Sequence, residues 1–288
     1  MRPVALLFLL LLSLTAAAQS PDSVFYDRRG NFEPHAVNPW ISLPVSLGAI
    51  WLGQRRADAV RDKGQIPLAE IRALSRDDVP GIDRVALDQD LEDRDRALFL
   101  SDYAANVAHV SPLVFLLFDK YRSNFVDIAS MFLEAQALQG LIYGYSPFGP
   151  GSTNRIRPLA YYLEADLEAR RGGNERNATF SGHVSMTSTS FYFIAKIIDD
   201  YNPQLTGGQR ALLYVGATLP SAYGGYLRVR GLKHFPTDVA IGMGVGAFSG
   251  IAVPELHRWW RARHPNSVAM ALPFYGDGAA GMGFTLRF

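Results

Sequence analysis

Along most of this chain, apolar residues recur among polar ones at the three- and four-residue intervals that predict helices. Helical spacing from residue 104 onward defines five apolar segments: "AANVAHVSPLVFLLF", "FVDIASMFLEAQALQGLIYGY", "SFYFIAKIIDDY", "ALLYVGATLPSAYGGYL" and "VAIGMGVGAFSGIAVPEL". Breaks rich in Gly, Pro and Asn, such as "SPFGPGSTN" and "NPQLTGG", separate these segments. The pattern predicts an all-α helical bundle, with its core in residues 101–265.

Two flanking regions differ from this core. Residues 266–288 carry "SVAMALPFY" and "MGFTLRF" on either side of "GDGAAG", which predicts a small C-terminal β-hairpin. Residues 19–100 form a polar lead and a charged helical segment. Its carboxylates could bind a metal, but the interleaved arginines favour ion-paired, solvated helix surface. The acidic residues are Asp88, Asp90, Glu92, Asp93 and Asp95, and the arginines are Arg84, Arg94 and Arg96.

The N-terminus has the pattern of a secretory signal peptide over residues 1–18. Arg2 precedes an apolar run at residues 4–14, and alanines at 16–18 precede Gln19. An uncleaved anchor helix is the alternative, although the run is shorter than the ~20 apolar residues that a membrane span needs. We therefore expect an exported protein, periplasmic or associated with a cell-envelope membrane.

Composition excludes several classes of function. The 288 residues carry a formal net charge of +1, so no global positive field attracts nucleic acid, and we expect no nucleic-acid partner. The chain has no cysteine, which excludes disulfides, thiol nucleophiles and thiolate metal sites. An anion site in this protein must be a local cluster of charges.

The apolar segments leave the type of membrane contact open. Most are short for a span, and acidic residues interrupt one of them. Trp259 and Trp260, flanked by arginines, resemble an interfacial anchor. Gly242, Gly246 and Gly250 form a small-residue stripe that lets helices approach closely, in lipid or in a tight core. We expect membrane association, either integral or peripheral.

One short charged stretch, "LRVRGLKHFPTD", carries candidate chemistry. His234 and Asp238 are four residues apart, so in a helix the carboxylate could accept a hydrogen bond from one imidazole nitrogen and leave the other free. Arg228 precedes His234 by six residues, and its planar guanidinium suits two oxygens of a tetrahedral anion.

Two upstream blocks could complete an anion site. Ser181, Gly182 and His183 stand at the predicted start of a helix, where backbone N–H groups and the helix dipole favour an anion. In "TNRIRPLAYY", Arg155 and Arg157 add positive charge. Each block alone is an ordinary helix cap or a basic loop, and only their combination indicates a site.

Together and in this order, the three blocks resemble the type 2 phosphatidic acid phosphatase superfamily, which includes class A acid phosphatases and vanadium haloperoxidases. The family pattern is Lys, six residues, Arg-Pro; then Pro-Ser-Gly-His; then Ser-Arg, five residues, His, three residues, Asp. The matching residues are Arg157-Pro158, Ser181-Gly182-His183, and Arg228, His234 and Asp238 with the same spacing.

Three positions depart from the family pattern. Phe180 stands in place of the proline, and Leu227 in place of the serine. Pro150 stands where the family has its lysine. We expect Arg155, or alternatively Lys233, to supply the missing positive charge.

The resemblance implies a metal-independent phosphatase without a cofactor. His234 would attack phosphorus, oriented by Asp238, and His183 would protonate the leaving oxygen and then assist hydrolysis of the phosphohistidine. The groups expected to hold the phosphate oxygens are Arg157, Arg228, Ser181, Gly182 and Arg155.

The substrate expected from this resemblance is a phosphate monoester or diphosphate, on a lipid or on a small ester. Phosphatidate, lipid A and polyprenyl diphosphates all suit the apolar segments. A vanadate-dependent haloperoxidase is one alternative, although Pro150 argues against it. A non-catalytic membrane protein that binds phosphate or lipid is the other.

Overall fold

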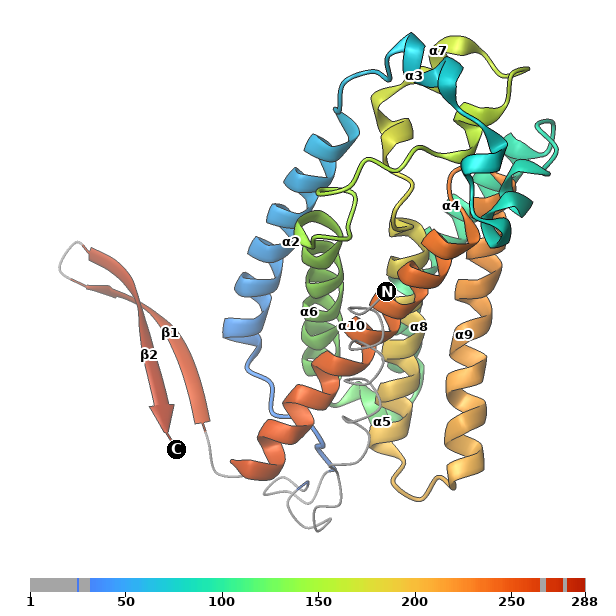
Figure 1. The fold of residues 1–288 in the computed structure, drawn as a ribbon. Coiled ribbons are helices and arrows are strands. Elements are labelled where there is room, and N and C mark those ends of the chain that lie inside the picture. The colour runs from blue at the N-terminus through green and yellow to red at the C-terminus, as the bar shows by residue number, and fades with distance from the viewer. Residues whose placement is uncertain (1–24, 26–31, 265–267, 277–278, 288) are drawn as a thin grey trace.

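The computed structural model describes residues 25, 32–264, 268–276 and 279–287. As predicted, the chain forms an all-α bundle (Figure 1). Its long helices are α2 (Pro39–Arg61), α4 (Arg94–Val110), α6 (Phe125–Tyr145), α8 (Gly182–Tyr201), α9 (Gly207–Arg230) and α10 (Pro236–Arg263). Among other pairs, α10 packs against α8, α2 against α6, and α4 against both α8 and α9.

Short elements gather at one end of the bundle, where α2 and α9 end and α8 and α10 begin (Figure 1). We call this the site end. It includes α3 (Leu68–Ala73), α7 (Leu167–Arg171) and the 3₁₀ helices η2 (Arg76–Asp78), η3 (Gly81–Leu87), η5 (Pro158–Tyr161) and η6 (Gly173–Arg176). The remaining short helices are η4 (Ser111–Leu117) and α5 (Asp119–Arg122).

The opposite end, which we call the far end, holds the start of α2 and the end of α10. His257 Nδ1 donates to the Ala36 carbonyl at 2.7 Å, and Arg261 pairs with Glu33 at 3.4 Å. These contacts join the segment before α2 to the last turns of α10.

The predicted glycine stripe lies where α10 crosses α8. A Cβ built on Gly242 would lie 2.8 Å from the Ser181 carbonyl oxygen, and one on Gly250 would lie 2.5 Å from the Thr189 carbonyl oxygen. Both distances are too short for a side chain, so glycine is required for this backbone approach. The stripe therefore fixes α10 directly against the first turn of α8, beside the motif residues.

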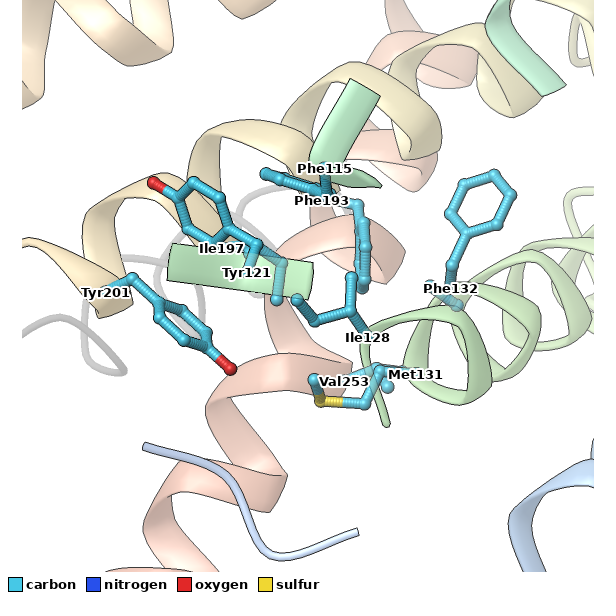
Figure 2. Close-up of a cluster of buried hydrophobic side chains, with 10 residues drawn as sticks. Phe115, Tyr121, Ile128, Met131, Phe132, Phe193, Ile197, Tyr201 and Val253 are labelled. Atoms are coloured by element: carbon cyan, nitrogen blue, oxygen red, sulfur yellow. The ribbon is translucent and has the colours of Figure 1, made fainter. Parts of the chain in front are cut away.

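A hydrophobic cluster fills the interior of the bundle. Figure 2 shows these side chains converging from η4, α5, α6, α8 and α10. Its buried members are Phe115, Tyr121, Ile128, Met131, Phe132, Ala135, Phe193, Ile197, Tyr201 and Val253. Burial of this much apolar surface is the main favourable term in folding and makes the bundle a rigid support.

A buried group of ion pairs lies between α8, α10 and the segment before α2. We call it the Asp200 cluster, and its members are His35, Lys196, Asp200, Glu255 and Arg258. Lys196 Nζ lies 2.5 Å from Asp200 Oδ1 and 2.5 Å from Glu255 Oε2. Arg258 and His35 reach the Asp200 carboxylate at 2.8 Å and 2.9 Å. Both cations, Lys196 and Arg258, thus have a carboxylate in direct contact, and His35, whose pKa is lowered by burial, joins Asp200 as a neutral ring.

The flanking regions agree with the sequence where the structure describes them. Strands β1 (Val268–Gly276) and β2 (Ala279–Arg287) form an antiparallel hairpin, as predicted. In the charged segment, Asp88 pairs with Arg76 and Asp95 with Arg94, which supports the interpretation as ion-paired surface. The predicted signal peptide, residues 1–18, lies outside the described residues.

Candidate active site

The three sequence blocks come together at the site end. Arg157 precedes η5, Ser181 caps α8, Arg228 lies in the last turns of α9, and His234 lies just before α10. The positive charges of Arg157 and Arg228 act on both His183 and His234, which places these four groups in one electrostatic environment. We call these residues, with Ser181 and Gly182, the motif cluster.

His234 is the most deeply placed titratable group of the motif cluster, with 2% of its surface exposed. Its Nδ1 lies 2.6 Å from the Ala178 carbonyl oxygen. A carbonyl can only accept, so Nδ1 carries the proton and Nε2 keeps its lone pair. Burial, followed by the charges of Arg157 and Arg228, holds the pKa of His234 well below its usual value. The ring is therefore neutral at pH 7.

Asp238 does not take the expected position against His234. Its Oδ2 accepts from the Phe235 backbone N–H at 2.9 Å, and its Oδ1 accepts from the Thr179 hydroxyl at 2.9 Å. The cause is local: α10 begins at Pro236, so His234 lies outside the helix and Asp238 occupies the third helical position, where a carboxylate caps the preceding N–H. The Ala178 carbonyl performs the orientation that we expected of Asp238.

Arg155 is also engaged elsewhere. Its guanidinium donates to Asp238 Oδ1 at 2.5 Å and to Asp83 Oδ2 at 2.7 Å, and it stacks over the Phe235 ring at 4.4 Å. Both carboxylates are buried. The expectation that Arg155 replaces the missing lysine is not supported by this geometry, because its charge is already balanced by two carboxylates.

Lys233, the other candidate for that charge, pairs with Glu175 at 3.0 Å. At the position of the missing lysine itself, the Pro150 carbonyl accepts from Lys63 Nζ at 2.7 Å. A lysine that follows α2 thus reaches this loop, but it binds backbone carbonyls there. The additional charge that acts on His183 comes from Arg61, in the last turn of α2.

Arg157 and Arg228 are buried cations with weak counterions. Arg157 lies 3.7 Å from Glu175 Oε1 and donates to the Asn177 carbonyl at 3.3 Å. Burial lowers the pKa of Arg228 to about 10, assisted by the neighbouring charge of Arg157, so it stays protonated at pH 7. Its Nε is buried and has no acceptor among the described residues. Such a donor suits an incoming anion.

His183 lies in the first turn of α8 on the accessible side of the cluster, with 43% of its side chain exposed. Desolvation, followed by the charges of Arg228 and Arg157, lowers its pKa, although the exposed part of the ring is screened by water. Its Nε2 lies 3.1 Å from Asp102 Oδ1. His183 and Asp102 therefore mark the side from which a ligand can enter.

Ser181 and Gly182 form the start of α8 as predicted. Ser181 is buried, its side chain accepts from the Val184 N–H at 3.5 Å, and its own N–H donates to the Asp238 carbonyl at 3.2 Å. A Cβ on Gly182 would lie 3.0 Å from the Tyr143 ring, so a larger residue would press on that tyrosine. The helix start is thus held rigidly beside the arginines.

Sequence reasoning missed three residues of this region. Asp102 contacts His183 and Arg228, Ser101 accepts from Arg228 at 3.3 Å, and Asp83 binds Arg155. All three precede the first motif and lie in segments that have only helical spacing as a signal. Asp83 is one of many acidic residues there, and its burial is visible only in the fold.

Other candidate sites lie away from the motif cluster. A groove of about 550 Å³ between α8 and α9 has an apolar lining that includes Ile194, Ile198 and Leu212. None of the motif residues lines it. Among the described residues, no group of three or more His, Asp or Glu side chains is arranged to hold a metal ion.

Residues 126–262 match the family model of the PAP2 superfamily. This segment therefore belongs to the PAP2 superfamily, in agreement with the resemblance seen in the three motifs. The superfamily includes phosphatases, which supports a phosphoric ester hydrolase in the broad sense. No curated protein and no solved structure matches the chain.

Proposed function

We propose that this protein is a metal-independent phosphatase that hydrolyses a phosphate monoester or diphosphate, carried by a lipid, through a phosphohistidine intermediate. The observation that carries the proposal is the hydrogen bond from His234 Nδ1 to the Ala178 carbonyl. It leaves a buried, neutral imidazole with its Nε2 lone pair available beside two arginines. A nucleophile with this environment suits attack on an anionic phosphate.

The chemistry takes two steps. His234 Nε2 forms a bond to phosphorus while the bond to the leaving oxygen breaks, and His183 gives that oxygen its proton. Water then attacks the phosphohistidine while His183 takes a proton from it, the P–N bond breaks and inorganic phosphate leaves. Arg157 and Arg228 stabilise the charge that develops on the equatorial phosphate oxygens.

The positions of Ser181 and Gly182 support a backbone contribution to phosphate binding. They begin a helix of 20 residues whose first N–H groups and dipole favour an anion. Asp238 and Arg155 belong to the support of the site: Asp238 accepts from the N–H before α10 and from Arg155. We assign them the role of holding the loop on which His234 lies.

A lipid substrate is supported by the apolar surface of the bundle. On α9, the exposed residues Leu212, Val215, Leu219, Tyr223 and Tyr226 recur every three or four positions along one face. On α4, which packs against α9, exposed apolar residues recur in the same way at positions 99, 103, 107 and 110. Apolar stripes of this length on the surface favour contact with a membrane.

Two further observations fit association with a membrane. Helices α6 and α10 are long and apolar enough to cross one, although 39% and 44% of their most apolar windows are buried inside the bundle. Trp259 and Trp260 are partly exposed near the end of α10, where an interfacial anchor is expected. Together with the predicted signal peptide, these features make a cell-envelope membrane the proposed location.

The test of the proposed activity uses the full chain purified in detergent, with EDTA present. We expect phosphate release from phosphatidate in mixed micelles and from a chromogenic phosphate ester, with the lipid hydrolysed more efficiently. Retention of the protein in membranes after carbonate extraction would establish integral association. Release into the carbonate supernatant would establish peripheral association.

The alternatives give different results in the same assay. A protein that binds inorganic phosphate but releases none from any ester would be a non-catalytic binder. Peroxide-dependent halide oxidation after addition of vanadate, without ester hydrolysis, would identify a haloperoxidase. Either result would contradict the proposed phosphatase.

A further inference from the structure

Asp102 connects two residues of the motif cluster from a helix that carries none of the motifs. It lies in the middle of α4, before the segment that matches the superfamily. Its Oδ1 lies 3.1 Å from His183 Nε2 and 3.2 Å from Arg228 Nη1. Ser101, the preceding residue, accepts from the same Nη1 at 3.3 Å. Helix α4 thus binds both groups through adjacent residues.

The contact of Arg228 with α4 leaves its Nε available for a ligand. Only Nη1 is held by α4, whereas Nε is buried without an acceptor among the described residues. A guanidinium fixed at one corner presents its remaining N–H groups in a set direction, as binding of a phosphate requires. Asp102 therefore orients Arg228 without using the whole guanidinium.

The same carboxylate lies beside the His183 ring. Its Oδ1 is 3.1 Å from Nε2, the separation of an ion pair with the protonated imidazole. A second proton on the ring, which catalysis requires, is favoured by the negative charge of Asp102.

The charges around His183 make this carboxylate important. The groups that lower the pKa of His183 include Arg228 on α9, Arg157 before η5, Arg61 on α2 and His109 on α4. His234, before α10, interacts electrostatically with the same ring. All of them are cations or histidines, and they disfavour the imidazolium. Asp102 is the carboxylate in direct contact with the ring.

We propose that Asp102 is a positioning residue of the active site: it holds Arg228 for phosphate binding and favours the protonated form of His183, which supplies the proton to the leaving oxygen. This inference rests on the proposed function and adds to it a residue outside the superfamily match. It assigns to α4 a direct part in the reaction.

The test measures hydrolysis of the chromogenic ester by the full-length Asp102→Asn protein between pH 4 and pH 9. Asparagine keeps an acceptor for His183 and Arg228 but removes the charge. We expect kcat at pH 7 to fall at least about tenfold and the alkaline limb of the kcat profile to move about one pH unit or more toward acid. Asp95→Asn, a change on the exposed first turn of the same helix, serves as the matched control.

Three results would overturn the inference. One is an unchanged position of the alkaline limb, because a merely structural role would lower the melting temperature without moving it. Another is an equal shift in the Asp95→Asn control. The third is tighter binding of inorganic phosphate by Asp102→Asn together with a higher kcat, which would make Asp102 a competitor of the substrate. Absence of hydrolysis by the wild-type protein would instead overturn the proposed function itself.

Discussion

Helix α8 has a buried group of charges near each end, and the two groups differ in how closely carboxylates balance their positive charges. In the Asp200 cluster, Lys196, Arg258 and His35 each have a carboxylate at 2.9 Å or less. In the motif cluster, Arg157 has its carboxylate at 3.7 Å and Arg228 at 3.2 Å. The first group is balanced by the protein, and the second keeps an excess of positive charge.

The difference has an energetic meaning. A buried ion is costly unless a counterion and hydrogen bonds replace the water that it loses. The charges of the Asp200 cluster meet this condition, and their contacts join α8 and α10 to the segment before α2. The motif cluster meets it only in part, since Arg228 Nε has no acceptor among the described residues. An uncompensated buried cation is tolerated where a ligand supplies the missing anion.

The largest predicted effect is on the motif cluster. In His234→Asn, the new amide can still donate to the Ala178 carbonyl, but the attacking Nε2 is lost. We expect hydrolysis to fall at least about 10⁴-fold, as for loss of other catalytic nucleophiles. Because His234 is buried, the melting temperature must be measured beside the rate. Wild-type turnover by the folded variant would refute His234 as the nucleophile.

Arg157→Met tests whether a charge of the motif cluster serves activity and not stability. Loss of the charge should lower kcat/KM by about 10- to 100-fold, the value of one charge-assisted hydrogen bond in the transition state. The melting temperature without ligand should not fall, because Glu175 keeps its contact with Lys233. Inorganic phosphate should raise the melting temperature of the wild type and not that of the variant. Equal protection of both proteins would argue against Arg157 as a phosphate ligand.

Asp200→Asn is the reciprocal experiment. It removes the shared counterion of Lys196 and Arg258, to which His35 is also hydrogen-bonded, and we expect a loss of about 3 kcal/mol in the free energy of unfolding. Activity per folded molecule should change less than about twofold, because the motif cluster keeps its geometry. Thermal unfolding and a titration of active sites together measure both quantities. A large loss of kcat at unchanged stability would contradict a structural role.

Arg155→Ala tests the corrected role of that arginine. Removal leaves the buried carboxylates of Asp83 and Asp238 without their cation, so we expect a stability loss of about 3 kcal/mol. A specific loss of phosphate affinity is not expected, which differs from the phosphate-binding role that the sequence suggested for Arg155. Arg155→Lys, which keeps the charge, should restore part of the stability. Loss of phosphate affinity at unchanged stability would instead support Arg155 as a phosphate ligand.

The smallest change concerns the pH at which the motif cluster works best. The mechanism needs His234 neutral and His183 protonated, which gives a bell-shaped profile of kcat/KM. Burial and the two arginines hold the pKa of both histidines below 6.5 in the free protein. Activity is lost as His234 gains a proton at low pH and as His183 loses one at higher pH, so the maximum should lie below pH 6.5. A maximum above pH 7.5 would contradict this account.

The sequence predicted those features of the molecule that are determined within a short stretch of chain. Helical spacing gave the all-α bundle, alternation gave the hairpin, and the stripe of Gly242, Gly246 and Gly250 marked a close helix contact. The motif spacings selected His183, His234, Arg157 and Arg228, which the fold brings together. Each of these signals lies within a short stretch of chain.

The remaining features depend on contacts between distant segments or on where a helix begins. The partner of His234 could not be read from the spacing of His234 and Asp238, because α10 starts after the histidine. Arg155 had the composition expected of a phosphate ligand, and only the fold brings Asp83 to it. Asp102 resembles any acidic residue on a helix surface until α4 packs against α8 and α9.

The packing of α2 and α4 has a consequence for protein engineering. The superfamily match begins at residue 126, after both helices, yet α4 contacts His183 and Arg228, and α2 packs along α6. A chimera that grafts residues 126–262 onto foreign flanking helices would inherit every motif and lose Ser101 and Asp102. Transfer of the complete site between relatives would therefore require the segment from α2 onward.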